Sequence, residues 1–408
     1  MPKSFLIWLL LSLFYAYQYI IRMVPAVSAS IINERFEIDP SHFGSFCGAF
    51  HIGYTIASIP VSIIIDRCSI KKVIPCAILL SALGILPLAG WEWQFSVIGR
   101  FVSGLGAVCA IIGLFKVISI YYPGDKYSRM LGIAFTIGLL GAVFAGSPLA
   151  RMITTLGFEN TMVFLSFFGI FLALKVYHAI PDDLTKPTSQ HFIKDILNDL
   201  KLVIYNKKLI LISLAGGLMI GGLEGFTDGW SVIVFEVIHG WNRIEASAVP
   251  SVIFFGMCIG SSLLGYLTEK TQRHYSIIAF AGGVMIICFY FILYQRTLTK
   301  ELLYILLSTI GACCAYKVVL LSKASAISRQ EVATTNPAFV NMFLMTSGSI
   351  YHTIIGSLIH RSNKDEFGSY LAPTISSGIS MIVFGMIIGV LMIVFIGIRE
   401  EQSRVSSI

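Results

Sequence analysis

A short charged stretch between two long apolar runs decides the fold: residues 62–72 have the sequence SIIIDRCSIKK. A related stretch, GYLTEKTQRH at residues 265–274, lies about half the chain length later, again directly after an apolar run. Both copies place a small residue four positions before an acid (Asp66 or Glu269) and a base directly after it. The same pattern at the same place in both halves indicates duplication of one structural unit, which is the plan of many transporters.

The sequence around these stretches is apolar enough to lie mostly within a membrane. Hydrophobic residues make up 56% of the 408 residues and charged residues only 12%, whereas a soluble domain has about 25% charged residues. A spanning helix needs about 20 apolar residues. The runs long enough to span are 5–32, 42–65, 73–90, 95–121, 129–151, 159–179, 209–237, 246–267, 275–294, 302–322, 335–359 and 371–397. They predict an all-α membrane protein with twelve transmembrane helices in two pseudo-symmetric six-helix bundles.

One long hydrophilic stretch, residues 180–208, lies almost halfway along the chain. Residues 191–205 place their apolar side chains on one helical face, which predicts an amphipathic helix on the membrane surface. We therefore expect an N-terminal six-helix bundle at 1–180, a cytoplasmic linker at 181–208 and a C-terminal six-helix bundle at 209–408.

Lysines and arginines indicate which side of the membrane the loops face. With both termini in the cytoplasm, 17 of the 29 basic residues lie on the inner side and seven on the outer side, as the positive-inside rule requires. The net charge of +7 then follows from topology and needs no nucleic-acid partner. We expect a monomeric, multi-pass protein of the lipid bilayer with both termini cytoplasmic.

Residues 62–72 resemble the signature loop of the major facilitator superfamily, Gly-x3-Asp-Arg/Lys-x-Gly-x-Arg/Lys-Arg/Lys, with Ser62 and Ser69 in place of its glycines. Two further motifs resemble that family in order and spacing: Arg100-x3-Gly104-x-Gly106 in span 4, and Gly138, Gly141, Gly146 and Pro148 in span 5. The resemblance implies the fold described above and a gate held by charged contacts. The implied gating residues are Asp66, Arg67, Lys71, Lys72, Glu269, Arg273 and Arg100. As an alternative, the loop charges serve only to orient the chain in the membrane.

The first-span sequence and the acid-x-Trp segment in span 7 also resemble a bacterial branch of phagosomal nutrient transporters. Members of that branch import amino acids or related nutrients. This resemblance implies location in a bacterial inner membrane.

Several basic side chains fall inside the predicted spans, where a charge is costly and usually serves function. Arg22 lies in span 1, Lys116 in span 4 and Lys317 in span 10, and the family resemblance implies that spans 1, 4, 7 and 10 line the central cavity. A guanidinium matches a carboxylate or phosphate with two parallel hydrogen bonds. The predicted substrate-binding residues are Arg22, Lys116, Lys317, Gln18, Tyr19 and Asn341. The alternatives are that Arg22 reaches outward from a helix end, that each lysine pairs with an acid, and that the polar residues bond between helices.

Two acids lie four residues apart in span 7, Glu224 and Asp228. Desolvation disfavours the charged form of a buried carboxylate, which suits proton uptake and release. We therefore predict that Asp228 or Glu224 is the proton-coupling group. The alternative is that one of them neutralises a buried lysine or arginine. The two interpretations overlap, because an ion pair that protonation breaks would itself couple proton uptake to transport.

These features predict a secondary active transporter that moves a small carboxylate-bearing solute, an organic anion or an amino acid, by alternating access, with a proton as co-substrate. An exporter of drugs or metabolites and a non-transporting receptor or scaffold are the alternatives. The chain has no HExxH, GxSxG or phosphate-loop motif, and its cysteines form no CxxC pair. We therefore expect no enzyme activity, no catalytic residue, no metal and no cofactor.

Overall fold

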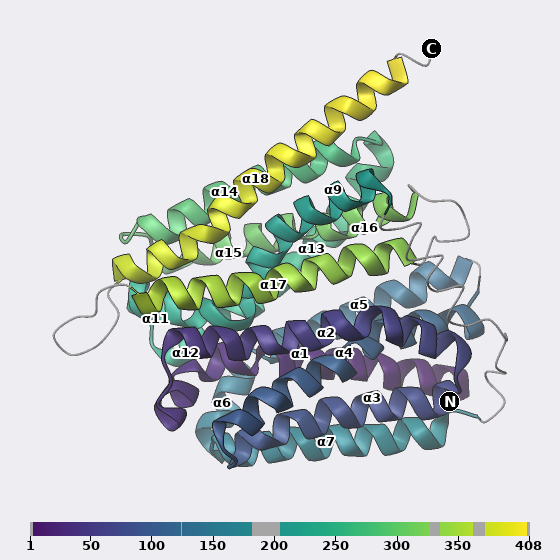
Figure 1. Cartoon of the computed structure of the whole chain (residues 1–408), viewed down its shortest axis with the longest axis vertical. Coiled ribbons are helices and arrows are strands. Elements are labelled where there is room, and N and C mark those ends of the chain that lie inside the picture. The colour runs from purple at the N-terminus through teal and green to yellow at the C-terminus, as the bar shows by residue number, and fades with distance from the viewer. Residues whose placement is uncertain (1–2, 124, 182–204, 327–334, 362–371, 406–408) are drawn as a thin grey trace. The chain divides into compact units, whose positions relative to one another are not determined.

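The computed structural model describes residues 3–123, 125–181, 205–326, 335–361 and 372–405 (Figure 1). These residues are helical almost throughout, and no strand occurs among them. Eleven helices are long and apolar enough to cross a membrane, and a bent pair makes twelve if it forms one span. This confirms the predicted all-α membrane fold. The amphipathic helix predicted at 191–205 lies, apart from residue 205, outside the described residues.

The chain divides into two compact units, of which the first comprises residues 1–38 and 49–196. The second comprises residues 39–48 and 197–408, so the first residues of α2 are counted with it. The helices in the first half of the chain are α1 (Lys3–Phe36), α2 (Pro40–Arg67), α3 (Ile70–Ile85), η1 (Leu86–Ala89), α4 (Trp93–Tyr121), α5 (Asp125–Phe144), α6 (Ser147–Leu156) and α7 (Phe158–Ala179).

The second half begins with a span built of five short segments, α9 (Lys207–Gly216), η3 (Gly217–Gly221), α10 (Gly222–Gly225), η4 (Phe226–Trp230) and α11 (Ser231–His239). The spans after it are more regular. They are α12 (Arg243–Ala246) with α13 (Ala248–Thr271), α14 (His274–Tyr294), α15 (Lys300–Cys314) with α16 (Tyr316–Ala326), α17 (Thr335–Arg361) and α18 (Ala372–Val405).

Corresponding spans pack together within each unit. In the first unit, α3 packs against α4 and α7, and α1 packs against α5. In the second unit, α14 packs against α15 and α18, and α17 packs against α9. Figure 1 shows α3 beside α7, and α14 beside α18. Spans 7 to 12 therefore repeat the packing of spans 1 to 6, as expected for a duplicated bundle.

Glycines allow one helix crossing to be close in both units. At each of four positions an added β-carbon would collide with a backbone carbonyl of the neighbouring helix, which only a glycine avoids. Small residues of this kind bring membrane helices into close contact. The positions are Gly53 and Gly104 between α2 and α4, and Gly256 and Gly311 between α13 and α15.

The predicted run 129–151 is a bent pair of helices. Residues Arg129–Phe144 and Ser147–Leu156 meet at an angle of 48°. The backbone of Gly146 is non-helical, and a proline follows in the first turn of α6. Proline cannot donate the hydrogen bond that would continue α5. The Gly-Ser-Pro sequence thus produces a bend within the predicted span.

The outer surface of the first unit is suited to lipid. Phe164, Phe167 and Phe171 of α7 are each more than half exposed. Their spacing of three and four residues places them on one helical face. In a soluble protein this apolar stripe would be a liability, whereas in a bilayer it faces hydrocarbon.

Candidate functional site

Helix α1 carries a buried charge beside a break in its own hydrogen-bond ladder. Pro25 lies inside the helix. Because proline has no N–H, the carbonyl of Ile21, four residues earlier, loses its usual donor. The backbone then departs from helical geometry at Ser28, with φ −125° and ψ 17°. The first span therefore has the bend that Pro25 predicts, just after Arg22.

Arg100 of α4 supplies the missing donor. Its Nη1 donates to the carbonyl oxygen of Ile21 at 2.8 Å, and its Nη2 donates to that of Arg22 at 3.1 Å. The side chain is buried, and its guanidinium lies 4.9 Å from the centre of the Phe50 ring. Arg100 therefore stabilises the bend that positions Arg22. Its gating role stays a prediction.

The substitution Arg100→Lys should destabilise the protein. A lysine keeps the charge but lacks the planar fork that reaches two carbonyls at once. A hydrogen bond to a charged group contributes about 1.5–3 kcal/mol, so we expect the free energy of unfolding to fall by about 2 kcal/mol. Thermal unfolding in detergent measures the change. Arg151→Lys, at an exposed position of α6, is the matched control, and equal melting temperatures for the two variants would contradict this role.

Polar side chains precede Arg22 along one face of α1. Arg22 is only 4% exposed, and its guanidinium lies 5.8 Å from the centre of the Tyr19 ring. The hydroxyls of Tyr19 and Tyr15 are 3.4 Å apart. Gln18 is buried, and within the described part of the chain its Oε1 has no hydrogen-bond partner. This face offers a guanidinium, two phenols and an amide, which suit a ligand that carries a carboxylate and hydroxyls.

Span 7 contains two π-helical segments, η3 and η4, with α10 between them. At the end of η4 the backbone N–H of Ser231 donates to the carbonyl of Phe226, five residues earlier. π-Helical turns are rare and occur frequently at functional sites. Glu224 lies in α10 and Asp228 in η4. Asp228 therefore lies within a π-helical segment, and Glu224 lies in the short α-helical segment between the two.

Glu224 forms a buried ion pair with one of the predicted substrate-binding lysines. Lys317 Nζ donates to Glu224 Oε1 at 2.7 Å, and the two side chains are 15% and 11% exposed. Lys317 is the second residue of α16, which begins directly after Ala315, the residue that caps the end of α15. The geometry matches the alternative considered for Lys317, pairing with an acid. It also matches a pair that protonation could break.

Asp228 lies deeper in the same unit and is 1% exposed. Its Oδ1 accepts a hydrogen bond from Thr227 Oγ1 at 3.3 Å. A ring nitrogen of His352 in α17 lies within 4.8 Å of a carboxylate oxygen of Asp228. The Thr227 hydroxyl also lies 3.0 Å from the Leu223 carbonyl and 3.2 Å from the Glu224 carbonyl. Thr227 thus stabilises the backbone between the two acids.

The predicted substrate-binding residues are divided between the two units. Gln18, Tyr19 and Arg22 share α1, and Lys116 is half-buried in α4 of the same unit. Lys317 and the half-buried Asn341 belong to α16 and α17 of the second unit.

The predicted gating residues other than Arg100 lie at helix ends. Lys71 is half-buried at the start of α3, with its Nζ 5.2 Å from the centre of the Tyr177 ring in α7. Asp66 and Arg67 end α2, and their side chains lie outside the described part of the structure. The remaining three are exposed: Lys72, Glu269 and Arg273.

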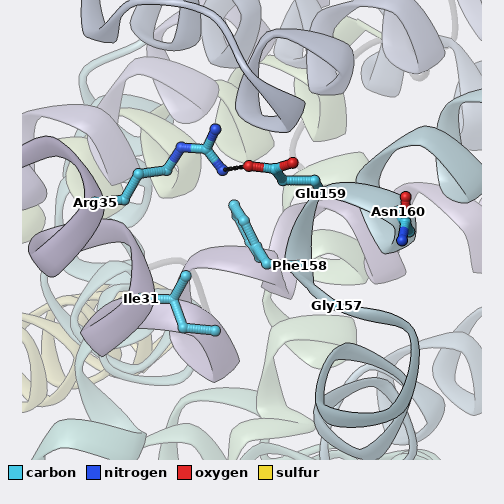
Figure 2. Close-up of a pocket in the computed structure, with 6 residues that line it drawn as sticks. All are labelled: Ile31, Arg35, Gly157, Phe158, Glu159 and Asn160. Carbon is cyan, nitrogen blue, oxygen red and sulfur yellow. Dashed lines mark ion pairs between the residues drawn. The ribbon is translucent and has the colours of Figure 1, made fainter.

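A pocket of about 510 Å³ lies at the C-terminal end of α1, beyond Arg22 (Figure 2). In it Arg35 Nη1 approaches Glu159 Oε1 at 2.9 Å and joins the last turn of α1 to the start of α7. The Glu159 side chain is 61% exposed, and exposed pairs of this kind contribute little stability. The pocket is open at the surface and is separate from the buried polar face of α1.

Thr227 and Tyr316 were not predicted from the sequence as part of the site. Tyr316 is fully buried, and its hydroxyl has no hydrogen-bond partner within the described residues. It directly precedes Lys317, as Thr227 directly precedes Asp228. A hydroxyl residue adjacent to an intramembrane charge is the signal that could have identified both.

Known proteins support assignment of this fold to a single large family. The family model of the Major Facilitator Superfamily matches residues 7–352. The hexuronate transporter of Bacillus subtilis (strain 168) is 21% identical over 372 residues, which are 86% of this chain and 80% of that protein.

Solved structures of transporters resemble the chain over nearly its whole length. A bacterial homologue of the human lysosomal transporter Spinster has a TM-score of 0.72 and 16% identity, over 97% of this chain and 96% of its own. The D-xylose–proton symporter has a TM-score of 0.72 and 15% identity, over 96% and 97%. The nucleoside transporter NupG has a TM-score of 0.73 and 12% identity, over 97% and 98%. At these identities the likeness concerns the fold.

Proposed function

The chain belongs to the Major Facilitator Superfamily, and from this premise we propose that it moves a small carboxylate-bearing solute across a bacterial inner membrane by alternating access, with a proton as co-substrate. In alternating access, the residues that bind the solute are exposed to each side of the membrane in turn. Both termini are cytoplasmic in this proposal, and the protein acts as a monomer.

The buried guanidinium of Arg22 is the observation that carries the substrate class. It lies in α1 beside phenol and amide groups, and a charge at this depth is costly unless it is used. Lys116 of α4 and Lys317 of α16 add positive charge on the other predicted cavity helices, and Asn341 adds an amide. This set of donors suits a carboxylate.

Among carboxylates, we propose sugar acids of the hexuronate type as the first candidates. Tyr15, Gln18 and Tyr19 offer hydrogen bonds to hydroxyl groups, and aromatic rings can pack against a sugar ring. The name of the Bacillus subtilis relative supports the same class. Amino acids, the other cargo that the sequence indicates, would also need an acid to receive the ammonium group, and Glu224 and Asp228 are the acids that could serve.

Proton coupling is proposed for Glu224 or Asp228. Protonation of Glu224 would release Lys317, and the freed ammonium could then attract the carboxylate of the substrate. Protonation at this pair would therefore raise the affinity for an anion, which is the order of events that a proton symporter requires.

Counterflow in proteoliposomes tests the substrate class. Vesicles with purified protein are loaded with unlabelled D-glucuronate and diluted into labelled D-glucuronate, with labelled amino acids in a parallel series. We expect the wild-type protein to accumulate labelled glucuronate, and the Arg22→Ala and Lys116→Ala variants to lose most of this accumulation. Accumulation that persists unchanged in both variants would exclude the anion site.

Export of a drug or metabolite is the second candidate, and the bend between α5 and α6 at the Gly-Ser-Pro sequence favours it. Gly-Pro motifs at this place are frequent in antiporters. Counterflow with apolar cations would identify such cargo. A receptor or scaffold would show neither counterflow nor proton movement when ligand is added.

Gating is proposed for the two repeated loops. Asp66, Arg67, Lys71 and Lys72 would hold one copy of the gate, and Glu269 and Arg273 the other. We expect charge reversal at Asp66 to change the ratio of transport rates in the two directions more than it changes substrate affinity.

A further inference from the structure

The π-helical segment η3 is stabilised by a side chain from another span. Tyr351 of α17 donates from its hydroxyl to the backbone carbonyl of Leu218 at 2.9 Å. Leu218 belongs to η3 (Gly217–Gly221). An interruption of the regular i to i−4 ladder leaves backbone groups that need other partners, and inside a membrane an unsatisfied carbonyl is costly. The phenol of Tyr351 supplies a partner of this kind.

The surroundings of Tyr351 are arranged to place its hydroxyl against η3. Tyr351 is 6% exposed. A β-carbon at Gly385 of α18 would collide with Tyr351 Oη, so only glycine leaves room for the phenol there. Any larger residue at position 385 would displace the hydroxyl from Leu218.

Glycines let span 7 lie directly against α17. Gly217, Gly221 and Gly225 recur every four residues and face α17, where an added β-carbon would meet Ser347 or the β-carbon of Tyr351. Such spacing brings helix backbones close together. Glycine has no side chain that could interlock with α17 and fix the register of span 7. The hydrogen bond from Tyr351 is therefore a specific restraint on that register.

The register of span 7 sets the position of Glu224. An α-helix advances about 1.5 Å and turns about 100° for each residue. A π-helical turn accommodates one extra residue. If that residue were lost from the turn, the part of span 7 after η3 would shift against the part before it by about one residue's rise and rotation. Glu224 is the third residue of α10, which follows η3 directly, and it pairs with Lys317 at 2.7 Å. A shift of this size would separate the pair.

We propose that Tyr351 is a positioning residue that keeps η3 in its π-helical register and thereby holds Glu224 opposite Lys317. Tyr351 acts through the backbone of span 7 and touches neither charged side chain in this role. The consequence for transport rests on the function proposed for Glu224 and Lys317, whereas the consequence for the register of span 7 does not.

Two variants remove the contact in different ways. Tyr351→Phe deletes the hydroxyl, and Gly385→Ala displaces it while keeping the tyrosine. Tyr290→Phe is the matched control for the first, because Tyr290 is 53% exposed on α14. Gly283→Ala is the matched control for the second, because no atom lies within 4 Å of a β-carbon added there.

The register is measured by the distance between spin labels at positions 211 and 237. Leu211 and Val237 lie on α9 and α11, on either side of the π-helical segments, and both are 39% exposed. Attachment through a bio-orthogonal side chain avoids the eight native cysteines. We expect a shifted or second distance population in Tyr351→Phe and Gly385→Ala, and the wild-type distribution in both controls. Wild-type distances in both test variants would overturn the proposal.

Transport kinetics give the second readout. With labelled D-glucuronate, we expect Tyr351→Phe and Gly385→Ala to lower the maximal rate about tenfold and to shift its pH profile, with a smaller effect on KM. Wild-type kinetics and pH profile in both variants would exclude a positioning role in transport. Absence of glucuronate uptake by the wild-type protein would instead contradict the proposed function, and the label distances would still decide the proposal for Tyr351.

Discussion

Glu224→Gln is expected to have the largest effect on stability of the substitutions considered. Its carboxylate lies 2.7 Å from Lys317 Nζ, and both side chains are mostly buried. Removal of one partner of a buried ion pair leaves the other charge uncompensated and costs about 3–5 kcal/mol. The variant should therefore unfold at a clearly lower temperature in detergent and should lose proton-coupled uptake.

A double variant separates stability from coupling. Adding Lys317→Met to Glu224→Gln removes the uncompensated charge, and replacement of a buried pair by uncharged groups is often close to neutral for stability. We expect the double variant to regain most of the melting temperature but no proton coupling. Glu301→Gln, at an exposed position of α15, is the control. A wild-type melting temperature for Glu224→Gln alone would contradict the importance of the pair.

Arg22→Ala is expected to have the largest effect on substrate affinity. A bidentate guanidinium–carboxylate contact consists of two charge-assisted hydrogen bonds, each worth about 1.5–3 kcal/mol. Since about 1.4 kcal/mol corresponds to a tenfold change, the Kd for D-glucuronate should rise about 100- to 10,000-fold. Calorimetric titration of the purified protein measures this change.

Arg22→Lys serves as the graded control for that prediction. It keeps the positive charge and loses the fork, so its Kd should lie between those of the wild type and Arg22→Ala. The Arg100 contacts go to backbone carbonyls of α1 and do not need the Arg22 side chain, so both variants should fold. An unchanged Kd in Arg22→Ala would contradict the role of Arg22 in binding.

Sequence pattern alone predicted the membrane fold because its signals are local and strong. Apolar runs long enough to span, the repeated acid–base stretches at Asp66 and Glu269, and Pro25 each act within a few residues of where they occur. The bend between α5 and α6 was not predicted, because hydropathy does not distinguish one long helix from two that meet at Gly146.

The shape of span 7 could not be predicted, because distant residues set it. The glycines of that span indicate an irregular helix, but they do not specify a π-helix. The hydrogen bond that stabilises η3 comes from Tyr351, 133 residues away along the chain. Likewise, the sequence indicated that Lys317 could pair with an acid but not which one, since Glu224 lies 93 residues away.

We expect a carboxylate and a proton to move together, with Arg22 binding the carboxylate and Glu224 exchanging the proton. Proteoliposomes that hold a trapped pH dye test it most directly when D-glucuronate is added outside. We expect acidification of the lumen by the wild-type protein, and none by Arg22→Ala or by the Glu224→Gln, Lys317→Met double variant. Uptake of labelled glucuronate by the wild-type protein without any change in lumenal pH would contradict the coupling, and acidification that persists in both variants would contradict the site.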